Sequence, residues 1–227
     1  YRNTSSWVRI KSDIYRLLPN TGGTSFDARN TIGLNGLVLF LLSVANYVKC
    51  LQGSSKKTVI YVGAGSGLFC YEGKVKDSYF PFTDISPDEC LYWLSGDYPG
   101  KLIQYREYLT RNKIVIFSYI VAPLSAFLVR LLNMKSSSFD TTLVARIIDE
   151  VRKSGFNLSK DKISYSHKLF IIRYWIFRFL IPKGSIKKAY IVSAYSYSEI
   201  CAVLKERGVE IIELQHGMIG PEHRGYN

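Results

Sequence analysis

Short apolar runs rich in β-branched residues recur along the chain, and helix-like segments separate them. They occupy residues 58–62, 113–119, 189–194 and 209–214. Runs of this length and composition are typical of buried strands. Strands that alternate with helices pair in parallel, because each crossover returns the chain to the same end of the sheet. The sequence therefore predicts an α/β fold with a Rossmann-like, mostly parallel sheet flanked by helices.

The segments between these runs predict the helices. One start signal is explicit at residues 84–89, where Ser86 would cap a helix, Pro87 would fill its first position and acidic residues would occupy its first turn. A helix following Glu89 is expected on this basis. Other helices are expected at residues 37–51, 101–111, 123–132, 139–153, 167–181 and 198–207.

The composition is that of a folded domain. The 227 residues are 47% hydrophobic and 14% aromatic, which suffices for a core and excludes a disordered chain. Residues 1–30 are polar and contain a turn-rich stretch, so we expect an N-terminal arm there. Residues 31–227 are expected to form the Rossmann-like domain.

Basic residues outnumber acidic ones by thirty to eighteen, giving a net charge of +12. Such an excess concerns association rather than fold. The chain has no zinc-finger spacing, RNP-like motif or basic-zipper pattern, and we expect no nucleic-acid partner. An anionic membrane surface or a diphosphate-linked lipid suits the interleaved aromatic residues better. Residues 167–181, apolar on nearly every face, fit either a core helix or a helix sunk in a membrane surface.

Two charge-free runs approach the length of a membrane span. Residues 30–48 are interrupted by polar and small side chains, and residues 114–129 contain Pro123. Both are interpreted as buried elements. The four cysteines are widely spaced and no secretory signal is visible, so reduced thiols are expected. The sequence predicts a cytoplasmic protein, peripheral at the inner face of the cell membrane.

The most specific motif follows the run at residues 209–214. Gln215, His216 and Gly217 come directly after it, and His223 and Arg224 lie a few residues further on. Open α/β sheets bind their ligands outside the carboxyl ends of their strands. The motif is therefore a candidate site, although a turn with a hydrogen-bonded histidine would also explain a lone His-Gly pair.

The pattern Glu-Leu-Gln-His-Gly-x-Ile-x-x-x-His-x-Gly-Tyr at residues 213–226 resembles a group of bacterial glycosyltransferases that build capsule, lipopolysaccharide and related surface glycans. Residues 7–10, 71–80 and 187–196 resemble other segments of that group more loosely. The resemblance implies a GT-B enzyme, in which two Rossmann-like domains face each other across a cleft. This chain would be the N-terminal, acceptor-side domain. The donor domain is then expected beyond Asn227, and the chain alone is expected to be inactive.

The resemblance implies transfer of a sugar from a nucleotide-sugar to a lipid-linked or polysaccharide acceptor. His216 can serve as the base for the acceptor hydroxyl or donate to the leaving phosphate. Glu213 is a second candidate base, or one partner of a structural ion pair. No Asp-x-Asp motif occurs, so no metal is expected, and no cofactor beyond the nucleotide-sugar substrate. The expected substrate-binding residues are Gln215, Gly217, His223, Arg224, Tyr195, Ser196, Gly63, Gly65 and Ser66.

Two other functions remain open at this point. The glycines of residues 63–67 follow a strand and resemble the first motif of S-adenosylmethionine-dependent methyltransferases, although their spacing does not fit the dinucleotide fingerprint. A loop that faces the interdomain cleft without binding a cofactor explains the same glycines. The third hypothesis is a non-catalytic membrane-surface association module built on residues 167–181.

Overall fold

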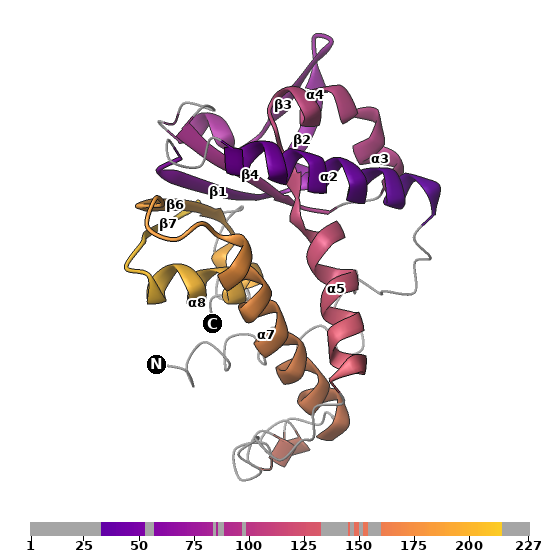
Figure 1. The fold of residues 1–227 in the computed structure, drawn as a ribbon, viewed down its shortest axis with the longest axis vertical. Coiled ribbons are helices and arrows are strands. Elements are labelled where there is room, and N and C mark those ends of the chain that lie inside the picture. The colour runs from indigo at the N-terminus through magenta and orange to yellow at the C-terminus, as the bar shows by residue number, and fades with distance from the viewer. Residues whose placement is uncertain are drawn as a thin grey trace.

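The computed structural model has an α/β fold, with a five-stranded parallel sheet flanked by helices (Figure 1). It is Rossmann-like in general kind, as the strand and helix pattern predicted. The structure describes residues 33–52, 57–83, 85, 89–96, 99–132, 145, 148–149, 152–153 and 160–214.

The elements follow one another as strands, short 3-10 turns and helices, with one hairpin outside the main sheet. In chain order they are α2 (Leu34–Gln52), β1 (Val59–Ala64), η2 (Gly65–Gly67), β2 (Leu68–Tyr71), β3 (Lys74–Asp77), η3 (Phe80–Phe82), β4 (Cys90–Ser95), α3 (Pro99–Gln104), α4 (Arg106–Arg111), β5 (Val115–Ile116), α5 (Phe117–Leu131), α7 (Lys160–Leu180), β6 (Lys188–Val192), η6 (Ala194–Tyr197), α8 (Ser198–Glu206) and β7 (Glu210–Leu214).

The strand order explains where a ligand site can form. The main sheet runs β5-β4-β1-β6-β7, and every neighbouring pair in it is parallel. The chain starts at the central strand β1, moves outward through β4 to β5, then returns to the other side of β1 for β6 and β7. Loops leaving β1 and β6 therefore diverge. This reversal is the topological switch point at which open α/β sheets bind ligands.

The helix predicted to follow Glu89 is wrong. The buried strand β4 begins at Cys90, and its first five residues are all buried. The run Cys-Leu-Tyr-Trp-Leu pairs with β1 on one side and β5 on the other, so burial on both faces overrides the local helix-start pattern. Residues 84 and 86–88, which carry that pattern, lie outside the described residues.

The second predicted strand, at residues 113–119, is much shorter in the structure. Only Val115–Ile116 pairs with β4, and α5 begins at Phe117. Pro123 lies inside α5 instead of opening a helix. The predicted helix at residues 101–111 is divided into α3 and α4 at Tyr105. Of the helix predicted at residues 139–153, residues 145, 148–149 and 152–153 are described and are helical, and the others lie outside the described residues.

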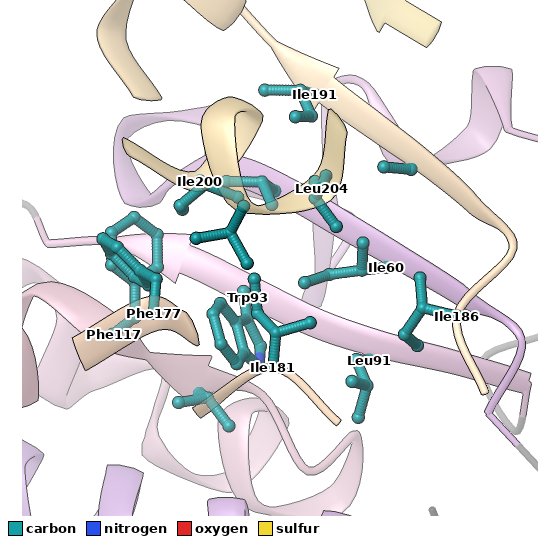
Figure 2. Packing of buried hydrophobic residues seen from close by; sticks show 14 of the residues in the cluster. Ile60, Leu91, Trp93, Phe117, Phe177, Ile181, Ile186, Ile191, Ile200 and Leu204 are labelled. Atoms are coloured by element: carbon teal, nitrogen blue, oxygen red, sulfur yellow. The ribbon is translucent and has the colours of Figure 1, made fainter. Parts of the chain in front are cut away.

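Helices cover both faces of the sheet. On one face α5, α7 and α8 enclose a core centred on Trp93, which is fully buried (Figure 2). On the other face α2, α3 and α4 pack against Tyr61 and Tyr92. The core interpretation of residues 167–181 is confirmed for one face of α7, whose Ile172, Ile176 and Phe177 are buried in this core together with Ile181, just after the helix. Trp175 and Phe179 on the same helix are exposed.

Candidate functional site

Four parallel strands end at one edge of the sheet and bring distant parts of the chain together there. Ala64 at the end of β1 pairs with Ser95 at the end of β4. On the other side, Val192 at the end of β6 pairs with Leu214 at the end of β7. The turns that follow β1 and β6 flank the switch point. This edge of the sheet is the candidate site.

Tyr197 links the three strands around the switch point. Its hydroxyl lies 2.8 Å from Ser95 Oγ and donates to the carbonyl of Gly63 at 3.3 Å. The ring also packs edge-on against Phe117 in the core. Ser95 was missed by sequence reasoning because β4 was missed. The signal that could have found it is the apolar run ending in Ser-Gly, which is how a buried strand reaches a ligand edge.

The turn after β6 contains a strained residue. Ser193 adopts a left-handed backbone conformation with φ of 57° and ψ of 67°, which is uncommon for a residue other than glycine. Its N–H donates to the carbonyl of Leu214 at 3.2 Å, and its own carbonyl accepts from the N–H of Ser196 at 2.9 Å. These bonds hold the 3-10 turn that contains Tyr195 and Ser196. Strained backbone of this kind clusters at functional sites.

Glu213 has a structural partner in the same turn. Its carboxylate accepts a hydrogen bond of 2.8 Å from the backbone N–H of Ala194, the first residue of the 3-10 turn. The side chain is exposed and stands one residue before the end of β7. Glu213 thus ties β7 to the turn after β6. Whether it also acts as a base stays a prediction.

The glycines after β1 are packed into the fold. Gly63 and Gly65 are buried, and only Ser66 of the short 3-10 turn is exposed. A Cβ atom at Gly63 would lie 2.8 Å from the ring and hydroxyl of Tyr61, so the strand needs glycine there. The carbonyl of Gly67 accepts from the N–H and the hydroxyl of Ser78. The loop is therefore fastened to the end of the β2–β3 hairpin.

A buried carboxylate supports this loop from below. Asp77 is 4% exposed and accepts hydrogen bonds from the hydroxyls of Tyr61 (3.0 Å) and Tyr92 (2.6 Å). It also accepts from the backbone N–H groups of Tyr79 and Phe80. Burial first, and the Asp77 charge second, raise the pKa of both tyrosines, so their hydroxyls remain donors at neutral pH. Asp77 therefore ties the end of the hairpin to β1 and β4 next to the loop.

The segment after the glycines decides what the loop can bind. A dinucleotide or S-adenosylmethionine loop leads into a helix, whose N-terminus faces the ligand. Here the turn leads directly into strand β2 of a hairpin. Lys101 on α3 brings a positive charge to the turn, because its Nζ donates to the carbonyl of Ser66 at 3.5 Å. The loop itself offers no helix N-terminus to a phosphate.

The remaining predicted site residues lie outside the described residues: Gln215, His216, Gly217, His223 and Arg224. The structure gives the backbone of Tyr195 only. It does describe the strand that leads into the motif, since β7 ends at Leu214. Within the described ranges, no group of three or more histidine, cysteine or acidic side chains is placed to hold a metal ion.

The chain matches no model of a known protein family, and comparison with curated proteins and with solved structures likewise returns no match.

Proposed function

We propose that this domain is the acceptor-side half of a GT-B glycosyltransferase that extends a bacterial cell-surface glycan. The sugar would come from a nucleotide-sugar, and the acceptor would be a lipid-linked or polysaccharide glycan. The observation that carries the proposal is the position of the motif in the chain. Gln215, His216 and Gly217 follow the end of β7, which pairs with β6 beside the switch point.

The chemistry of glycosyl transfer fits this edge of the sheet. The reaction needs a base for the acceptor hydroxyl and donors for the departing phosphate. His216 is the proposed base. His223, Arg224 and the N–H of Gly217 are the proposed phosphate partners, and Gln215 the proposed contact to sugar hydroxyls. Ser66 and Ser196, on the two turns that flank the switch point, would bind the acceptor, with Gly63, Gly65 and Tyr195 shaping that region.

The methyltransferase alternative has one observation for it and one against it. The glycine-containing turn after β1 lies at the switch point, where such a cofactor would bind. The hairpin that follows the turn removes the helix on which such a loop depends. We therefore favour glycosyl transfer.

Calorimetric titration of the chain with three ligands tests the proposal. They are a diphosphate-linked lipid saccharide, a panel of nucleotide-sugars and S-adenosylmethionine. We expect the lipid saccharide to bind and S-adenosylmethionine not to bind. Nucleotide-sugars should bind weakly, because their main contacts would belong to the donor domain. Binding of S-adenosylmethionine alone would replace the proposal with the methyltransferase.

A matched pair of variants locates the binding. Ser66→Glu adds a carboxylate beside the switch point and should weaken binding of the anionic acceptor by about tenfold through charge repulsion. Thr110→Glu adds the same charge at an exposed position on α4 and should leave the affinity unchanged. Equal losses in both variants would show a general charge effect, and would remove the assignment of the acceptor to this edge.

A further inference from the structure

Helix α2 exposes its apolar face and turns its more polar face toward the protein, the opposite of an ordinary surface helix. The stripe that faces the protein consists of small or polar residues together with one leucine: Gly36, Leu39, Ser43, Asn46 and Cys50. The stripe that faces away is apolar along its whole length and repeats every three or four residues. It comprises Leu34, Leu37, Val38, Leu41, Val44, Val48 and Leu51, each at least 36% exposed. We call these seven residues the outer stripe.

Hydrogen bonds fix this orientation. Asn46 Nδ2 donates to the carbonyls of Leu109 (3.1 Å) and Ile114 (2.8 Å). Ser43 Oγ accepts from the N–H of Ile116 at 3.2 Å. These buried groups would lose their partners if the helix turned over, at a cost typical of unsatisfied polar atoms. The outer stripe therefore points outward because the inner stripe is bonded to the segment around β5.

The same packing bears on whether α2 crosses a membrane. By length and composition it is the one helix, among the described residues, that could span a bilayer, and only 28% of its apolar window is buried. A helix that crossed a bilayer alone would be surrounded by lipid, whereas α2 lies along the sheet in contact with β5, α3 and α5 (Figure 1). A helix with one apolar face outward and the other held by protein suits the plane of a membrane surface.

The charge around α2 indicates what binds the outer stripe. No acidic residue occurs between Asp27 and Glu72, and Lys49 is the one charged residue of α2. Arg111 and Lys113 are exposed beside the α4–β5 turn, which Asn46 and Cys50 contact. A second copy of the chain would bring two charges of +12 together along a helix only about 28 Å long. An anionic bilayer matches both the apolar stripe and the charge.

We propose that the outer stripe of α2 docks the protein on an anionic phospholipid surface, with the leucines and valines entering the acyl boundary. This inference is independent of the proposed sugar transfer. It places the membrane contact on α2 instead of on residues 167–181, the alternative that the sequence left open, because Ile172, Ile176 and Phe177 of α7 are buried in the core.

Vesicle sedimentation of the whole chain tests the proposal. Wild type should bind vesicles that contain phosphatidylglycerol, bind pure phosphatidylcholine far less, and release as salt rises. Leu41→Glu should lower binding at least about tenfold, because burial of one leucine side chain has that worth. Phe127→Glu on α5 is the matched control, at 59% exposure against 57% for Leu41, and should bind like wild type.

Each contrary outcome has its own meaning. Unchanged binding of Leu41→Glu, with loss in Trp175→Glu, would transfer the site to α7 and overturn the proposal. Equal binding to neutral and anionic vesicles would overturn the choice of lipid. A wild-type dimer that Leu41→Glu converts to a monomer, without vesicle binding, would make a second copy the occupant. Leu41→Trp keeps the stripe apolar, and should show quenching by brominated lipids beyond that of wild type.

Discussion

The turns after β1 and β6 flank the same switch point but are built in different ways. At the end of β1, the tight position is a glycine, Gly63, and a buried aspartate that accepts from two tyrosine hydroxyls supports the turn that follows. After β6, the tight position is Ser193, a residue for which the left-handed conformation is costly, and an exposed glutamate ties the turn to the next strand. The first turn uses its unusual residues for packing. The second holds strain at the edge where the motif emerges, which is the more informative sign of a site.

Replacement of Asp77 should have the largest effect on stability, because it tests the support beneath the first turn. Asp77→Ala leaves two buried tyrosine hydroxyls and two N–H groups without their acceptor, and should lower the free energy of unfolding by roughly 3–5 kcal/mol. Urea unfolding measures the loss. Asp77→Asn keeps one acceptor oxygen and should cost about half as much. An alanine variant as stable as wild type would show that the cluster does not support the turn.

A pair of glycine substitutions tests the packing role of the first turn. Gly63→Ala would place its Cβ 2.8 Å from the Tyr61 ring and 3.0 Å from Leu94, so we expect a loss of about 1–3 kcal/mol. At Gly67 the nearest atom would lie 3.6 Å away, in ordinary contact. Gly67→Ala should therefore be neutral or slightly stabilising. Thermal unfolding distinguishes them, and equal losses would contradict the steric explanation.

The smallest stability effect is expected in the second turn. Glu213→Gln keeps an oxygen acceptor for the N–H of Ala194 at an exposed position, so the melting temperature should change little, by the equivalent of about 0.5 kcal/mol or less. Sugar-transfer turnover of the variant, in the enzyme that carries this chain with its proposed donor domain, then separates two roles. A fall of less than about tenfold fits a structural carboxylate, and a fall of about 10²-fold or more would make Glu213 the base.

Much of the fold was predictable because burial and periodicity agree along most of the chain. The strands at β1, β6 and β7 and the helices at α2 and α8 follow their patterns closely, whereas α7 begins at Lys160, seven residues before the predicted start. Strand β4 was not predicted, because the capping pattern at Ser86 and Pro87 indicates a helix. Local capping residues carry no information about strands that pair from distant parts of the chain. The same limit applies to the outer stripe of α2. Periodicity reveals that the helix has an apolar face, but not that hydrogen bonds of Asn46 and Ser43 turn the opposite, polar face toward the protein.

The candidate site was predictable only in part. The motif at Gln215 to Gly217 was found from the sequence and follows a strand that the structure confirms. Tyr197 and Ser95 are hydrogen-bonded although they lie more than a hundred positions apart in the chain, and no local signal predicts that contact. The packing of Gly63 against Leu94 likewise depends on pairing with β4, a strand that the sequence did not reveal. The sequence pattern identified the end of the strand, but the residues that lie beside it in neighbouring strands follow only from the register of the sheet.

The most direct test of the account is turnover of His216→Ala in the enzyme that carries this chain with its proposed donor domain. Radiolabelled sugar transfer from a panel of nucleotide-sugars to a lipid-linked acceptor is measured beside the melting temperature. We predict an unchanged melting temperature and a fall in turnover of roughly 10²–10⁴-fold, the usual contribution of a positioned acid or base. His223→Ala should cost less. Near-wild-type turnover in His216→Ala would make the residue part of a structural turn and contradict the proposed site.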